Sequence, residues 1–196
     1  LHAIVFSPGC SELCRTGWPA HILESDMLIL ASASPRRREL LTQAGLSFTA
    51  EAADLNEDRM PNEAAAAYVQ RLAEEKAHAV WTLHQNADTP EDPLIVLGAD
   101  TCVVCDGQIL GKPVDTADAR RMLELLSGRT HAVLTGIAAV TRRGTLRDLD
   151  ITQVTFNVRK DPEIAQYSAT GEPLDKARAD SIQGYAARWI PRIEGC

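Results

Sequence analysis

Short apolar runs alternate along the chain with segments whose apolar residues recur every three or four positions. These are the patterns of strands and helices respectively. The runs predict strands at 27–33, 46–53, 94–97, 102–105, 131–141 and 146–158, with a further strand near the C-terminal end. The helical spacing predicts helices at 35–44, 62–80, 116–126 and 161–169. Because strands and helices alternate and some strands are joined by hairpins, the pattern predicts an α/β fold with a mixed sheet.

Local cap and turn residues set the predicted ends of several elements. Pro35 suits the first position of a helix because its missing N–H would be unpaired there, and Ser34 before it is a natural N-cap. Gly45 can end this helix, and Asn62 is expected to cap the long helix that follows. The pair Asp106–Gly107 predicts a tight hairpin turn.

Composition and charge exclude two classes of protein. The 196-residue chain carries a formal net charge of −7, whereas binding to a nucleic-acid polymer calls for a basic surface. No stretch reaches the roughly 20 apolar residues that span a bilayer, so no membrane partner is expected. Residues 1–26 lack the pattern of a signal peptide and are expected to form an irregular N-terminal extension before a domain at 27–196. The expected setting is cytoplasmic.

The cysteines are expected to be structural. Five cysteines, an odd number, do not make a disulfide framework. Cys102 and Cys105 form a C-x-x-C, but no second pair follows at zinc-ribbon spacing, and the two positions point to opposite faces of a strand. Buried thiols are therefore favoured over metal ligands.

The first candidate site is a strand–turn–helix corner. Segment 32–38 holds two serines, a proline and three arginines between a predicted strand and the start of a helix. Arginines at a helix N-terminus oppose the helix dipole, whereas backbone N–H groups, hydroxyls and guanidiniums together suit an anion such as phosphate. On these residues alone, arginines that simply face solvent remain an alternative.

A carboxylate and a lysine form a second candidate site. Asp100 follows an apolar run and a glycine, where α/β sheets place ligands, and the predicted hairpin is expected to bring Lys112 beside it. Such a carboxylate can activate water or hold a divalent cation, although an aspartate that caps a turn gives the same pattern. Glu57, in the acidic loop 54–61, can complete a magnesium site with Asp100, and a solvated glutamate is the alternative.

Two further residues are candidates on weaker local grounds. Lys76 lies on the long predicted helix, where most lysines are solvated. Gln183 lies between small residues near the C-terminal end, and its amide can pair with the imide edge of a base. A surface glutamine in a turn would look the same. The five histidines show no spacing typical of a catalytic or metal cluster.

Several of these residues belong to a set of longer blocks. The blocks are LILASASPRRREL (28–40), RLAEEKA (71–77), GADT (98–101), ILGKP (109–113), LSGRTHAVLTG (126–136) and GEPLDKA…IQG (171–184). In order and spacing, over roughly residues 28–195, they resemble the Maf family. This family comprises nucleoside triphosphate pyrophosphatases related in fold to inosine-triphosphate pyrophosphatases.

The resemblance implies a mixed, twisted sheet flanked by helices, in two lobes with a central cleft. It implies hydrolysis of a nucleoside triphosphate between the α and β phosphates with a divalent cation, Mg²⁺ or Mn²⁺, and it suggests a homodimer. By the same resemblance Asp100 matches the general base, and Glu57 an acidic position near the metal. The positions that match the phosphate site are Ser32, Arg36, Arg37, Lys76 and Lys112.

Three specificity positions, Arg36, Thr101 and Gln183, resemble the branch that favours dTTP and UTP and accepts modified pyrimidine nucleotides. The 7-methyl-GTP branch carries Trp, Gln and Glu there. We therefore expect a house-cleaning pyrophosphatase; 7-methyl-GTP hydrolysis and a nucleotide-binding regulator of cell division without turnover are the alternatives. The chain departs from the family at residues 178–181, where Arg-Ala-Asp-Ser replaces Gly-Ala-Tyr-Gly. The family also continues beyond the position of Cys196 with a further strand and a helix.

Overall fold

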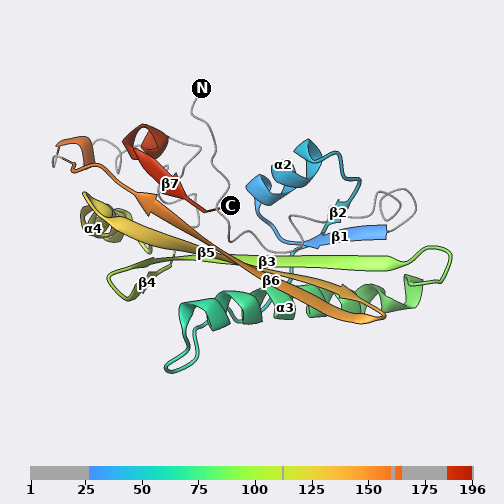
Figure 1. Cartoon of the computed structure of the whole chain (residues 1–196). Coiled ribbons are helices and arrows are strands. Elements are labelled where there is room, and N and C mark those ends of the chain that lie inside the picture. The colour runs from blue at the N-terminus through green and yellow to red at the C-terminus, as the bar shows by residue number, and fades with distance from the viewer. Residues whose placement is uncertain (1–26, 112, 160–161, 165–184, 196) are drawn as a thin grey trace. The chain divides into compact units, whose positions relative to one another are not determined.

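The computed structural model describes residues 27–111, 113–159, 162–164 and 185–195 (Figure 1). The elements are, in chain order, β1 (Met27–Ala31), α2 (Pro35–Gln43), β2 (Thr49–Ala50), α3 (Ala65–His84), the 3-10 helix η2 (Gln85–Ala87), β3 (Leu94–Cys105), β4 (Gln108–Leu110), α4 (Thr116–Leu126), β5 (Thr130–Thr141), β6 (Gly144–Thr155), the 3-10 helix η3 (Tyr185–Trp189) and β7 (Arg192–Glu194). The described residues divide into two compact units. We call them the α3 unit (27–101 and 135–149) and the α4 unit (described residues of 102–134 and 150–195).

The strands of the described residues form one mixed sheet. Its order is β2-β1-β3-β5-β6-β7, with β4 paired to β3. β1 pairs in parallel with β2 and β3, whereas β4 and β7 pair antiparallel with β3 and β6. Asp106 and Gly107 turn β3 into β4 with φ of 48° and 75°, the positive values that a two-residue hairpin turn favours. The predicted α/β fold with a mixed sheet and flanking helices is confirmed.

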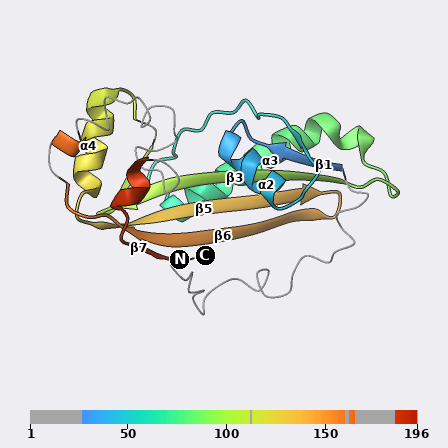
Figure 2. The same cartoon turned by 90° about the horizontal axis from the view of Figure 1, so that it is seen from above.

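In the α3 unit, α3 covers one face of the sheet and α2 lies on the other (Figure 1, Figure 2). Two glycines allow α3 to approach closely. A Cβ atom at Gly98 of β3 would lie 2.0 Å from the carbonyl oxygen of Ala73, and one at Gly136 of β5 would lie 2.5 Å from that of Val69. The close contact places the middle of α3 beside the residues that follow Gly98. The buried apolar core of this unit is Ile29, Ala31, Ala73, Ala77, Val80, Leu94, Val96, Ala138 and Val140.

In the α4 unit, α4 buries the apolar face that its spacing predicts. The Asp115 side chain caps this helix by accepting a hydrogen bond from the Asp118 N–H at 2.7 Å. Cys102 and Cys105 are buried thiols, as expected. The core of this unit is Val103, Cys105, Leu110, Met122, Leu123, Leu126, Val154, Phe156, Ile164 and Trp189.

Two predicted elements differ from the structure at their ends, and for the long helix the reason is local. The strand expected at 46–53 is reduced to β2, and the N–H of Glu51 then donates to the carbonyl of Leu30 at 3.0 Å. The long helix begins at Ala65 rather than after Asn62, because Asn62 has a φ of 59° and cannot open a right-handed helix. Its N-cap position is Ala64, whose side chain makes no capping hydrogen bond.

Other predicted boundaries shift less. The runs at 94–97 and 102–105 are parts of the single strand β3, and β6 covers residues 144–155 rather than 146–158. Of the helix predicted at 161–169, residues 162–164 are helical and the others lie outside the described residues, as does the predicted extension 1–26. Among the described helices, none is long and apolar enough to cross a membrane.

Candidate active site

The candidate site forms where a short strand ends beside a longer parallel one. Ala31, the last residue of β1, pairs with Gly98 of β3, whereas β3 continues through Asp100 and Thr101. Ser32 follows β1 directly and is buried, and α2 begins three residues later. The carboxyl ends of strands in open α/β sheets are where ligands bind. The strand register therefore brings Ser32, Asp100 and Thr101 to such an edge.

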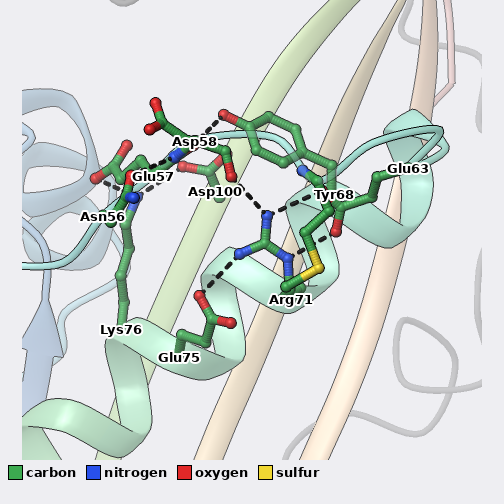
Figure 3. A network of polar contacts seen from close by, with 10 residues as sticks. Asn56, Glu57, Asp58, Glu63, Tyr68, Arg71, Glu75, Lys76 and Asp100 are labelled. Carbon is green, nitrogen blue, oxygen red and sulfur yellow. Dashed lines mark hydrogen bonds and ion pairs between the residues drawn. The ribbon is translucent and has the colours of Figure 1, made fainter.

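A buried lysine joins two carboxylates at this edge (Figure 3). Lys76 Nζ donates to Asp100 Oδ1 at 2.8 Å and lies 2.9 Å from Glu57 Oε1. The side chains of Lys76 and Asp100 are 9% and 13% exposed, whereas that of Glu57 is 53% exposed. α3 buries Lys76 between the two residues that pack on Gly98. An ammonium at this depth needs paired negative charge, and Asp100 and Glu57 supply it.

Arg37 connects α2 with the two strands. Its Nη1 donates to Ser32 Oγ at 3.1 Å and its Nη2 to Thr101 Oγ1 at 3.3 Å. Burial lowers the pKa of the Arg37 guanidinium, and the nearby negative charges of Asp100 and Glu57 act in the opposite direction. Because an arginine stays protonated in proteins, Arg37 is a desolvated cation close to both carboxylates.

The start of α2 is open to an anion. Ser34 occupies the predicted N-cap position, but its side chain makes no capping hydrogen bond, and its own N–H donates to Ser32 Oγ at 3.2 Å. Arg36 is half-buried beside Arg37, whereas Arg38 is exposed. The first turn therefore combines backbone N–H groups with a half-buried guanidinium, a combination that suits phosphate.

The acidic loop 54–61 is tied to α3 (Figure 3). The Tyr68 hydroxyl donates to the carbonyl of Glu57 at 2.9 Å, and Arg71 Nη2 donates to the carbonyl of Asp58 at 3.1 Å. Arg71 also pairs with both carboxylate oxygens of Glu63, from Nε at 2.6 Å and from Nη2 at 2.9 Å. These hydrogen bonds lower the pKa of Glu63 to about 2 and raise the pKa of Arg71.

The structure brings most of the predicted site residues together. Lys112 and Gln183 lie outside the described residues. The segment expected to deliver Lys112 is described as far as Gly111, and Leu110, the last residue of β4, pairs with Val103. The described predicted residues form two groups of contacts, in which Arg37 binds the hydroxyls of Ser32 and Thr101, and Lys76 binds Asp100 and Glu57. The two groups meet at Asp100 and Thr101, which are consecutive residues of β3.

Comparisons with known proteins identify the family of the chain. The family model described as Maf-like protein matches residues 27–196. This chain belongs to the Maf family. Over 175 residues, this Maf chain is 47% identical to a protein of Citrifermentans bemidjiense named dTTP/UTP pyrophosphatase, with 88% of this chain and 87% of the relative covered. Relatives of the same name from Hahella chejuensis and Salmonella typhimurium are 48% and 49% identical over 168 residues, each match covering 86% of this chain and 82% of the relative.

The structure adds four residues that the sequence of this Maf chain does not single out. Thr135 of β5 donates to Thr101 Oγ1 at 3.2 Å and so extends the hydroxyl cluster around Arg37. The others, Tyr68, Arg71 and Glu63, hold the acidic loop. Thr135 and Arg71 fall inside blocks that resemble the family, but the blocks alone do not indicate what these two residues do. Tyr68 and Glu63 fall outside every block.

Proposed function

We propose that this Maf chain hydrolyses dTTP and UTP to the nucleoside monophosphate and pyrophosphate. The observation that carries the proposal is the contact of buried Lys76 with Asp100 and Glu57, close to the desolvated Arg37. Such a site offers cations for phosphate and carboxylates for a water molecule or a metal ion. The relatives named dTTP/UTP pyrophosphatase, almost half identical over most of this chain, support the same reaction and substrates.

In the proposed reaction, a water oxygen bonds to the α-phosphorus while the bond from that phosphorus to the oxygen bridging to the β-phosphorus breaks. The carboxylate of Asp100 orients the water and accepts its proton, the role of a general base. Lys76 and Arg37 stabilise negative charge that develops on the phosphate oxygens, and the hydroxyl of Ser32 and the start of α2 hold a phosphate group. Pyrophosphate leaves with the electron pair of the broken bond.

The carboxylates fit a divalent cation, which we include in the proposal. Within the described part of the chain, no group of three or more His, Cys, Asp or Glu side chains is placed to hold a metal ion. Mg²⁺ does not need one, because it binds through one or two carboxylates and takes further ligands from substrate phosphates and water. Glu57 and Asp100 both contact Lys76 Nζ, so their carboxylates are neighbours. Mg²⁺ or Mn²⁺ would supply a Lewis acid and charge neutralisation for the phosphates.

The choice of base is proposed to depend on Arg36, Thr101 and Gln183. An amide at Gln183 can pair with the imide edge that uracil and thymine share, which favours these bases over 7-methylguanine.

We also infer a reducing, cytoplasmic setting, supported by the buried thiols Cys102 and Cys105 in a chain with an odd number of cysteines. The homodimer that the family resemblance suggests is testable by sedimentation.

A panel of nucleoside triphosphates, each incubated with the protein and Mg²⁺ or Mn²⁺, tests the proposal by the phosphate species released. We expect pyrophosphate from dTTP and UTP, and little from 7-methyl-GTP. Asp100→Asn should lower kcat by about 100-fold or more, the contribution of a positioned general base. Asp106→Asn is the matched control, because Asp106 lies on the same strand–turn segment, is exposed and pairs with Arg129.

Three results would contradict the proposal. Release of orthophosphate in place of pyrophosphate would place the cleavage at a different bond. Wild-type activity in Asp100→Asn would remove Asp100 from the mechanism. Tight binding of dTTP or UTP without turnover would support a nucleotide-binding regulator instead.

A further inference from the structure

Glu57 depends on polar contacts for its position, because its loop has almost no buried surface. Residues 56–62 are all exposed, and Leu55 is only half-buried. β2, the strand before the loop, is two residues long. Apolar burial therefore contributes little to the conformation of this loop, and hydrogen bonds have to define it.

Two of the side chains that make these bonds, Tyr68 and Arg71, project from α3 (Figure 3). Arg71 and Tyr68 reach the backbone carbonyls of Asp58 and Glu57, which belong to the two peptide units on either side of the Asp58 Cα atom. Glu63, whose carboxylate accepts hydrogen bonds from Nε and Nη2 of Arg71, also accepts one from the Met60 N–H at 3.0 Å. The loop is thus fixed on both sides of Asp58.

Arg71 is the centre of this arrangement. Its Nη1 donates to Glu75 at 3.0 Å, so each of its three guanidinium nitrogens is engaged, and its side chain is 18% exposed. The guanidinium also lies 5.7 Å from the centroid of the Tyr68 ring. Pairing with the Glu63 carboxylate through two nitrogens fixes direction as well as distance, which lysine cannot reproduce.

We propose that Arg71 is a positioning residue for the divalent cation: it holds the acidic loop so that the Glu57 carboxylate stays beside Asp100. This inference rests on the proposed function, since it assigns Glu57 to the metal. Arg71 itself acts through the loop. Lys76 lies about one and a half turns after Arg71 on the same helix. α3 therefore supplies both the buried cation and the support for the exposed carboxylate.

The test compares Arg71→Met, Arg71→Lys and Tyr68→Phe with a matched control, Arg120→Met. Arg120 is also a helical arginine paired with a glutamate four residues later, but it lies on α4 in the other unit. The first measurement is the rate of trypsin cleavage after Arg59, in the exposed loop, without nucleotide or metal. The second is the Mg²⁺ concentration for half-maximal pyrophosphate release, with kcat at saturating Mg²⁺.

We expect Arg71→Met to be cleaved after Arg59 about tenfold faster or more, because cleavage follows the population of the open loop. Half-maximal activity should need about 10- to 100-fold more Mg²⁺, the usual effect of removing a residue that supports a ligand. At saturating Mg²⁺, kcat should return to within a few-fold of wild type. Arg71→Lys should fall between, Tyr68→Phe should show a smaller change of the same kind, and Arg120→Met should show neither.

Unchanged cleavage after Arg59 together with an unchanged Mg²⁺ requirement in Arg71→Met would overturn the inference. So would cleavage that rises equally throughout the chain with a lower Tm, because Arg71 would then support the fold and not the loop. If Arg71→Met does not fold, Tyr68→Phe, which loses a single hydroxyl, decides by the same two measurements. A wild-type protein that releases no pyrophosphate contradicts the proposed function, and the cleavage rates then still decide whether Arg71 holds the loop.

Discussion

Replacing Gly98 with alanine tests the close contact between α3 and β3 that places Lys76 beside Asp100. A Cβ atom at Gly98 would lie 2.0 Å from the carbonyl oxygen of Ala73 and 2.9 Å from the backbone nitrogen of Ala77. Both are backbone atoms of α3, which cannot turn aside as the end of a flexible side chain can. The helix itself therefore has to move away from the strand.

The expected losses of stability and of kcat follow from these distances. Ordinary contact begins at 3.4 Å, so helix and strand must separate by about 1.4 Å at this point. Overpacking of a close-packed interior costs ~1–3 kcal/mol, and contact with helix backbone belongs at the upper end, about 3 kcal/mol. In a protein of this size such a loss lowers the Tm by about 6–12 °C. Lys76 lies between the two contacting residues, so it moves relative to Asp100, and a displacement near 1 Å lowers kcat by about 100-fold.

Thermal unfolding and pyrophosphate release measure the two effects separately. Gly111→Ala is the control for stability, because its added methyl group meets nothing within 4 Å, and its Tm should stay within about 1 °C of wild type. Gly136→Ala meets Val69, about two turns before Lys76, so it should lower the Tm with a smaller loss of kcat. A Gly98→Ala protein with wild-type Tm and kcat would refute close packing as the cause of the Lys76 position.

Two further predictions concern stability. Hydrogen bonding to Arg71 lowers the pKa of Glu63 from 4.5 to about 2, so the stability advantage of wild type over Glu63→Gln should be complete above pH 4.5, decline as the pH falls, and vanish below about pH 2. Urea unfolding across this pH range measures the difference, and an advantage that persists below pH 2 would exclude the ion pair as its source. Asp115→Ala removes the side-chain cap of α4 and should cost about 1 kcal/mol, whereas Asp115→Asn, which keeps an acceptor, should cost less; equal losses in urea unfolding would contradict the capping role.

Elements defined by local signals could be predicted from the sequence. Pro35 and Gly45 mark the ends of α2 because each residue acts on its own backbone, by a fixed φ and by a left-handed φ of 75° respectively. The Asp106–Gly107 hairpin follows for the same reason. Asn62 failed as a cap because the same side chain suits both a cap and a left-handed turn, and here it adopts the turn.

The candidate site also combines features that local sequence predicts with contacts that it cannot predict. Asp100 at the end of a strand–glycine pattern is a local signal, but its contact with Lys76 joins residues 24 positions apart. Spacing along the chain cannot predict that contact, and only the family resemblance placed the two together. The contact depends on Gly98, where the missing side chain brings α3 against β3. A glycine in a strand signals close approach of another backbone, without indicating which one.

Nothing in the sequence assigns any residue the role of supporting the acidic loop, although Arg71 falls inside one of the matching blocks. By composition, Glu57 has the pattern of a solvated residue, and 53% exposure of its side chain agrees with that description. Its position is nevertheless defined, because Tyr68 and Arg71 bind backbone carbonyls in the loop. Every residue of a loop offers such a carbonyl, so the loop sequence does not record the interaction.

The charges of the site connect substrate with cation. Among the described site residues, Lys76 pairs with the carboxylates of Asp100 and Glu57, and Arg37 is close enough to both carboxylates to feel their charge. The formal charges of these two cations and two carboxylates sum to zero. A nucleoside triphosphate adds several negative charges to this desolvated place, and Lys76 cannot neutralise phosphate while it neutralises both carboxylates. Further positive charge would favour binding, and in the proposed function Mg²⁺ or Mn²⁺ on the carboxylates would release Lys76 for phosphate. This balance supports the proposal that nucleotide and divalent cation bind together.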